Sequence, residues 1–81
     1  MPRFFFDTQD GEAAFRDQGG VELARLEDVA QEAFGLLRDL SHRALPRGET
    51  RISASVRDAS GVVVFRATMA ITADWEPDGL A

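Results

Sequence analysis

Residues 51–72, RISASVRDASGVVVFRATMAIT, decide the fold because they contain two strands and the turn between them. In residues 51–57, small and branched apolar side chains alternate with serine and arginine, as in a strand that buries one face. Residues 58–61, DASG, suit a hairpin loop whose last position takes a positive φ, which glycine adopts without strain. A second strand then runs from Val62 to about Thr72, so this stretch predicts an antiparallel β-hairpin.

The same stretch predicts a register for the hairpin. If Val56 lies opposite Val63, then Ile52 lies opposite Ala67. This register gathers the apolar side chains on one face, and a shift of one residue would send them to the other face. We therefore expect Val63 to belong to the core.

A helix from Leu26 to about Ala44 is the clearest element before this hairpin. Apolar residues recur at helical spacing along one stripe, and the opposite face carries acids, arginines and His42. The stripe comprises Leu26, Val29, Ala30, Ala33, Leu37, Leu40 and Ala44. Pro46 and Gly48 end the helix, and we expect one face to be buried and the other to be solvated.

Residues 4–12, FFFDTQDGE, predict a strand that leads into a turn. The strand covers Arg3–Asp7, Asp10-Gly11 is a hairpin signal, and a weaker second strand covers residues 12–16. Because side chains alternate along a strand, Phe4 and Phe6 point to one face and Phe5 points to the other. We assign Phe4 and Phe6 to the core beneath the helix.

Together these elements predict an α+β fold with the order β-β-α-β-β. Three to four antiparallel strands form one layer, and the helix forms the second layer on one face of the sheet. Residues 1–73 are expected to be a single domain, because a chain of 81 residues has room for one core. Residues 74–81, DWEPDGLA, are expected to form a flexible C-terminal tail.

The sheet face away from the helix is the first candidate functional surface. It is expected to carry Phe5, Val62 and Val64 beside Arg57 and Arg66, so apolar and basic side chains mix on it. A small domain with exposed valines gains stability when a partner covers them. We expect a non-enzymatic interaction or regulatory module whose partner is a second copy of the chain, giving a homodimer, or an unknown protein.

The acidic first turn is the second candidate. Asp7, Asp10 and Glu12 fall close together, which invites comparison with a calcium-binding loop. If Asp10-Gly11 takes the middle of such a loop, Phe6 stands where the first carboxylate ligand is required, so the pattern fits a hairpin better. A regulatory domain that binds a metal or a small molecule through this turn is the alternative function. No resident cofactor or metal is expected.

Composition and charge argue against several classes of protein. The formal net charge is −5 and the arginines are scattered, which is unsuited to binding a nucleic acid. The chain has no cysteine for disulfides or thiolate chemistry. It also has no apolar run near the roughly 20 residues of a membrane span, and its N-terminus lacks a signal-peptide pattern. We expect a cytoplasmic protein that does not bind membranes.

No residues form a recognisable catalytic set. His42, the one histidine, is expected near the end of the helix, where the helix dipole favours positive charge. Ser41 is its neighbour in sequence, but adjacent residues on a helix do not face each other. The glycines match neither a phosphate-binding loop nor a dinucleotide-binding pattern. We therefore expect no enzymatic activity.

Four segments together resemble a known family. They are MPRFFFD at residues 1–7, DG at residues 10–11, GVEL at residues 20–23, and VRD at residues 56–58 followed by Gly61. In these segments the chain resembles short bacterial proteins, each a domain of unknown function, that open M-P-R-[YF]-[FY]-F and carry a late V-R-D-x-x-G hairpin. The resemblance covers nearly the whole length. It departs at residues 17–20, DQGG, and at residues 24–26, which lack the usual aspartate cap. It implies a small cytoplasmic domain and carries over no catalytic residue.

Overall fold

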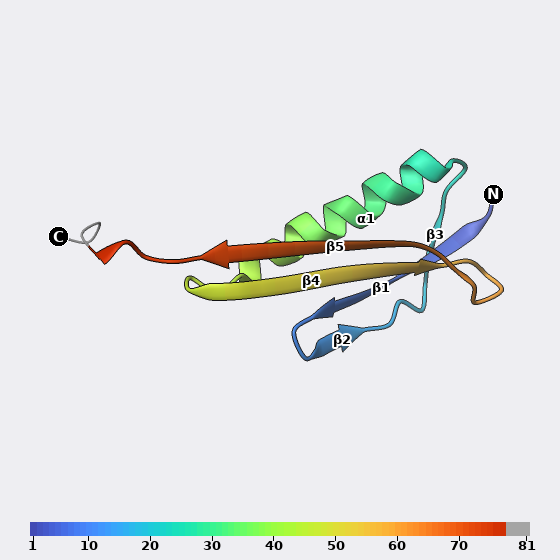
Figure 1. Cartoon of the computed structure of the whole chain (residues 1–81). Coiled ribbons are helices and arrows are strands. Elements are labelled where there is room, and N and C mark those ends of the chain that lie inside the picture. The colour runs from blue at the N-terminus through green and yellow to red at the C-terminus, as the bar shows by residue number, and fades with distance from the viewer. Residues whose placement is uncertain (78–81) are drawn as a thin grey trace.

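An antiparallel sheet with one helix across one face makes up this computed structural model, which describes residues 1–77 (Figure 1). The elements are β1 (Arg3–Asp10), β2 (Ala13–Phe15), β3 (Val21–Glu22), α1 (Leu26–Leu40), β4 (Gly48–Arg57) and β5 (Val63–Ala73), with a 3₁₀ turn at Ser41–Arg43. The strand order is β2-β1-β4-β5, and β3 pairs with the other end of β1. The predicted α+β fold is confirmed.

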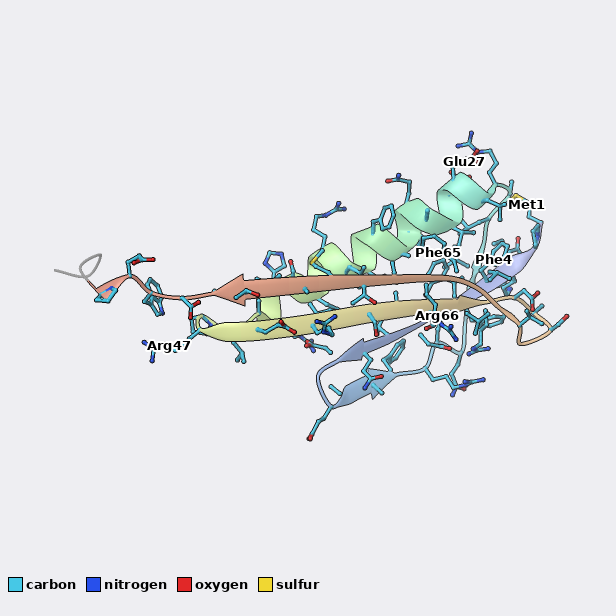
Figure 2. The ribbon with its side chains drawn as sticks, in the orientation of Figure 1. Met1, Phe4, Glu27, Arg47, Phe65 and Arg66 are labelled. Atoms are coloured by element: carbon cyan, nitrogen blue, oxygen red, sulfur yellow. The ribbon has the colours of Figure 1, made fainter. Side chains whose placement is uncertain are left out.

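The core lies between α1 and the inner face of the sheet (Figure 2). Phe4 and Phe6 are buried there, as predicted from the alternation of the three phenylalanines. The other buried apolar residues are Val29, Ala33 and Leu37 of α1 and Ile52, Ala54 and Val56 of β4. Their spacing of four residues on the helix and two on the strand places each set on one face. Phe65, Ala67 and Met69 of β5 pack against this core but are only partly buried.

The first turn lies later in the chain than the sequence predicts. β1 continues to Asp10, which pairs with Ala13, so the turn consists of Gly11 and Glu12 alone. Gly11 has φ 61°, and among the described residues only glycines have a positive φ, so the φ of Glu12 is negative. A positive φ at the first central position alone is typical of a type II′ hairpin turn. The weak second strand exists, but it is limited to Ala13–Phe15.

The short strand β3 has no counterpart in the sequence prediction. Val21 pairs with Phe4 and Glu22 pairs with Arg3, so the segment that leads into the helix also extends the sheet. Gly20 precedes it with φ 71°, and a Cβ at this position would lie 2.9 Å from the Phe4 carbonyl oxygen and from the Phe5 ring. Only glycine allows the chain to pass this close to β1.

The predicted register of the β4–β5 hairpin is wrong by two residues. Val56 pairs with Phe65 and Ile52 pairs with Met69, and a β-bulge interrupts the ladder next to Arg57. The bulge brings Val63 opposite Arg57, on the sheet face away from the helix, so Val63 is exposed rather than part of the core. Because a shift of two residues preserves the faces of a strand, the rest of the predicted core is unaffected.

The helix is shorter than predicted and buries less of its apolar stripe. It ends at Leu40 rather than near Ala44, where the Ser41 hydroxyl donates a hydrogen bond to the Arg38 carbonyl and the chain tightens into the 3₁₀ turn. Leu26, at its first position, is exposed. Beyond β5, residues 74–76 have no regular secondary structure, and residues 78–81 of the expected tail lie outside the described residues. Within residues 1–77, no helix is long and apolar enough to cross a membrane.

Candidate interaction surface

Two of the predicted surface residues, Phe5 and Arg57, are paired with each other. They lie opposite each other on β1 and β4, and the Arg57 guanidinium carbon lies 4.8 Å from the centroid of the Phe5 ring. This distance is within the range of a cation–π contact. Phe5 is half-buried as a result, so less of its ring is available to a partner than the sequence implies.

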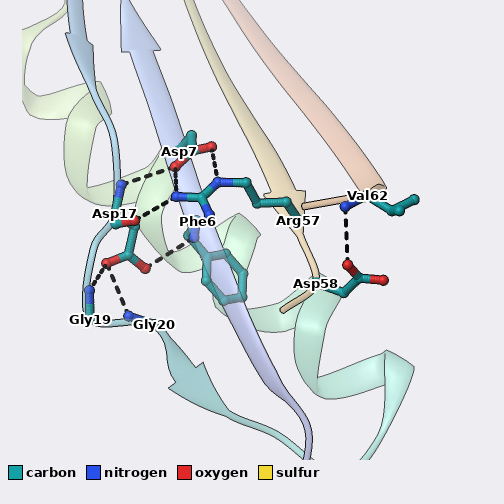
Figure 3. Close-up of polar contacts among 8 residues, drawn as sticks. All are labelled: Phe6, Asp7, Asp17, Gly19, Gly20, Arg57, Asp58 and Val62. Carbon is teal, nitrogen blue, oxygen red and sulfur yellow. Dashed lines mark hydrogen bonds and ion pairs between the residues drawn. The ribbon is translucent and has the colours of Figure 1, made fainter. Parts of the chain in front are cut away.

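Arg57 also joins two segments that are distant in sequence (Figure 3). Its Nε donates to Asp7 Oδ2 at 2.9 Å, and its Nη2 donates to the Asp17 carbonyl oxygen at 2.7 Å. The side chains of Arg57 and Asp7 are only 15% and 24% exposed, so water screens this ion pair less than a pair on the open surface. Arg57, the arginine of the VRD segment, therefore holds together β1 and the loop between β2 and β3 that contains Asp17.

The Asp17 side chain takes the place of a strand hydrogen bond at the gap between β2 and β3. Its Oδ2 accepts the backbone N–H of Phe6 at 3.0 Å, which is a hydrogen bond that a continuous edge strand would otherwise supply. Its Oδ1 accepts the N–H groups of Gly19 and Gly20, both at 3.2 Å, and its own N–H donates to Asp7 Oδ1 at 2.9 Å. The structural role of Asp17 was not predicted from the sequence, although an aspartate two residues before a glycine pair is typical of a side-chain-capped turn.

Both carboxylates of this network have lowered pKa values. Partial burial alone would raise the pKa of Asp7, but hydrogen bonds from Arg57 and from the Asp17 N–H, with the positive charge of Arg57, lower it below its ordinary value. Burial also acts to raise the pKa of Asp17, and the N–H groups of Phe6, Gly20 and Gly19 more than offset this effect. Both groups are therefore charged in the folded protein at neutral pH.

The structure separates the three residues of the acidic turn. Asp7 is bound to Arg57, and Asp10, an odd number of residues along β1, lies on the opposite face of the sheet. Glu12 is an exposed residue of the two-residue turn. Among residues 1–77, no three acidic or histidine side chains are placed to share a metal ion.

Three consecutive valines lead into β5 and form an exposed apolar segment. Val62, Val63 and Val64 are 58%, 42% and 45% exposed. Asp58 positions this segment, because its Oδ1 accepts the N–H groups of Ser60 and Val62 at 2.9 and 3.0 Å. Arg66, two residues beyond Val64, is exposed opposite Ser55. The structure thus leaves Val62, Val64 and Arg66 accessible from the predicted set, with Val63 added by the bulge.

Among residues 1–77, the outer edge of β5 is the longest free strand edge. β5 is eleven residues long, contains no proline, and has Arg66 as its one charged residue. One side of β5 pairs with β4, and no other strand among residues 1–77 pairs with its second side (Figure 1). The sequence alone does not reveal this edge, because strand order depends on contacts between distant segments.

A groove on the opposite side of the molecule is a second candidate binding surface. It lies between α1 and the β1–β2 hairpin and has a volume of about 450 Å³. Its apolar lining comes from Phe6, Phe15, Val21, Leu36 and Leu40, and its charged lining comes from Asp17, Glu32, Asp39 and Arg43. The exposed ring of Phe15 contributes to this groove because β2 extends the sheet beyond the width that one helix can cover.

Comparison with known proteins identifies a family without an assigned activity. The profile of DUF6894, described as a domain of unknown function, matches residues 3–70. This match covers all five strands except the last residues of β5, together with the whole helix. No curated protein matches the chain, and no solved structure does.

Proposed function

The chain belongs to the DUF6894 family of domains of unknown function, and we propose that it is a small, non-enzymatic protein-interaction module that forms homodimers through β5. The free edge of β5 is the observation that carries this proposal. An unpaired edge presents a row of backbone N–H and C=O groups that another strand can bind. Proteins that remain monomeric usually protect such an edge with short strands, prolines or several charges.

The opposite edge of the sheet has that protection, and this contrast supports the choice of β5. On the far side of β1, the edge is divided into β2, of three residues, and β3, of two residues. The gap between them is closed by the Asp17 side chain, which uses the free N–H of Phe6. β5 has only the bulge at its start and the single charge of Arg66.

The proposed surface is the β5 border of the helix-free face rather than its centre. Phe5 and Arg57 are held in an intramolecular network, so their substitution would alter the fold before it altered binding. Val62, Val64 and Arg66 project at the border instead, next to the free edge. A partner that binds the edge would also cover these side chains.

Sedimentation velocity over a range from low to high micromolar concentration tests this proposal. The wild-type chain is expected to shift from monomer to dimer, and Val64→Lys is expected to weaken the dimer because it places a charge on the proposed surface. Phe15→Ser is the control, since Phe15 is apolar and more exposed than Val64 but lies on the opposite edge strand. A wild-type chain that stays monomeric at the highest concentration, or equal weakening by both variants, would overturn the proposal.

The groove supports a second candidate function, the binding of a small apolar molecule that carries a positive charge. Its volume is within the roughly 300–1,000 Å³ range of ligand pockets. Its apolar walls are accompanied by three carboxylates and one guanidinium group. Thermal-shift titration with an aryl-alkylamine is expected to raise the melting temperature of the wild-type chain but not of Leu36→Arg, which places a positive charge in the groove. An equal shift in both would count against the groove.

A cytoplasmic location is part of the first proposal and rests on composition. The chain has no cysteine, so its fold does not depend on the oxidising compartments in which disulfides form. Fluorescence microscopy of a tagged chain in bacterial cells, with membrane and periplasmic markers, tests the location.

A further inference from the structure

The core is less complete at β5 than at β4. The inward-facing residues Ile52, Ala54 and Val56 of β4 are at most 1% exposed. The inward-facing residues of β5, which include Phe65 and Met69, are only partly buried. Phe34 of α1 contacts Phe65 edge-to-face, with ring centroids 6.1 Å apart, and is itself 45% exposed. An apolar layer thus ends abruptly above the free edge.

We infer that β5 pairs antiparallel with β5 of a second copy, with Thr68 opposite Thr68 at the two-fold axis, so that two sheets become one. This inference rests on the proposed function and specifies its geometry. Thr68 is the middle residue of β5, Val63–Ala73, so this register pairs the largest number of residues. A closed dimer with identical surfaces requires this kind of two-fold, self-complementary contact.

The side chains of β5 fit this register. Phe65 would lie opposite Ile71 of the second copy, and Ala67 would lie opposite Met69, on the helix-covered face. On the other face Arg66 would lie opposite Ala70, and Thr68 would meet its own copy, a favourable threonine pair. Moving the two-fold axis by two residues, from Thr68 to Arg66, would slide the strands by four residues and place Arg66 opposite Arg66, which like-charge repulsion disfavours.

The two-fold axis also decides where the helices lie. Two antiparallel strands related by a two-fold axis can share a sheet only if the axis is perpendicular to that sheet, so both helices lie on the same face. Phe34 of each copy then lies beside the seam, above Phe65 of its own chain and the neighbouring Ile71 of the second copy. The second copy therefore continues the apolar layer that ends at the free edge.

Cysteine cross-linking tests the register directly, since the chain has no cysteine of its own. Directly opposite residues have Cα atoms about 4.5–5.5 Å apart, which is within disulfide range. Thr68→Cys is expected to give a covalent dimer under mild oxidation. Thr72→Cys, on the same strand and face, is the control, because its two copies would be eight residues apart along the strands, or about 27 Å.

A charge exchange between Arg66 and position 70 provides an independent measurement. Ala70→Glu is expected to tighten the dimer roughly ten-fold, because two new opposite-charge pairs form, and Ala70→Arg is expected to weaken it by a similar factor. Combining Ala70→Arg with Arg66→Glu is expected to restore affinity. Within one chain residues 66 and 70 are about 13 Å apart on the same strand, so restoration would report pairing between copies.

The outcomes separate this inference from the proposed function. A dimer that forms by sedimentation but shows no Thr68→Cys cross-link, or equal cross-linking of both cysteine variants, would overturn the register while leaving the interaction module intact. A dimer whose dissociation constant does not change in the charge-exchange variants would also overturn the register and leave the interaction module intact. A chain that remains monomeric would overturn the proposed function as well.

Discussion

Replacing Arg57 with methionine is expected to destabilise the fold strongly, because one side chain joins three segments. Arg57 donates to Asp7 Oδ2 at 2.9 Å and to the Asp17 carbonyl oxygen at 2.7 Å, and it covers the Phe5 ring. Shielded hydrogen bonds from a charged group contribute about 1.5–3 kcal/mol each, and a cation–π contact contributes about 0.5–1 kcal/mol. Exposures of 15% and 24% reduce the ion-pair contribution. We therefore expect a loss of roughly 2–4 kcal/mol in the free energy of unfolding, or about 10–20 °C in melting temperature.

Urea denaturation followed by circular dichroism measures this loss, and Arg51→Met is the matched control. Arg51 is on the same strand and face, but its ion pair with Glu49 is exposed, with side chains 63% and 52% accessible, so its loss should cost less than about 0.5 kcal/mol. Asp7→Asn and the double variant complete a thermodynamic cycle, with an expected coupling of about 1–2 kcal/mol between Arg57 and Asp7. Equal losses at positions 57 and 51, or strictly additive effects of the Arg57 and Asp7 substitutions, would refute the role given to Arg57.

Three further predictions concern the same end of the sheet. Acidification is expected to lower the free energy of unfolding, because the pKa values of Asp7 and Asp17 are lowered on folding. The stability that these two carboxylates contribute is present above the unfolded pKa of about 4 and is lost as the pH falls through their folded pKa values. Asp17→Asn should flatten this dependence in urea titrations between neutral pH and pH values near 3. Gly20→Ala should cost at least about 2 kcal/mol by thermal denaturation, because of its positive φ and the 2.9 Å contacts of the added Cβ, whereas Gly35→Ala in the helix should stabilise by about 0.5–1 kcal/mol. Phe5→Ser should lower the free energy of unfolding by about 1–2 kcal/mol through loss of ring burial and the Arg57 contact. The dimer dissociation constant should not change. A weakened dimer at unchanged stability would show that Phe5 belongs to the interaction surface.

Local periodicity was sufficient to predict most of the fold. The alternation in β4 and the apolar stripe of α1 each describe a single element, and burial of one face follows directly from the spacing of residues. The assignment of Phe4 and Phe6 to the core is confirmed for the same reason. The hairpin register required more than a pattern, because the bulge beside Arg57 depends on how Asp58 caps the loop. Patterns with a period of two cannot distinguish registers that differ by two residues.

The candidate surface was less predictable because it depends on strand order and on contacts across the chain. Phe5 and Arg57 were both placed correctly on the helix-free face, but their pairing follows from β1 lying next to β4. The role of Asp17 depends on a gap in an edge strand that no local pattern describes. The free edge of β5 likewise follows from the strand order β2-β1-β4-β5, in which β1 and β4 are the central strands and β5 lies at the end of the sheet.

The residues that carry the family resemblance stabilise the fold, so they do not by themselves identify a binding site. Arg57 binds Asp7, Asp58 caps the hairpin, and Gly61 has the φ of 88° that the loop needs. None of these groups is free to bind a ligand without loss of a contact that holds the sheet together. A strand edge is recognised mainly through backbone N–H and C=O groups, which every residue except proline supplies in full. A domain that acts through such an edge requires a long, unprotected strand rather than a catalytic motif, and β5 has these properties.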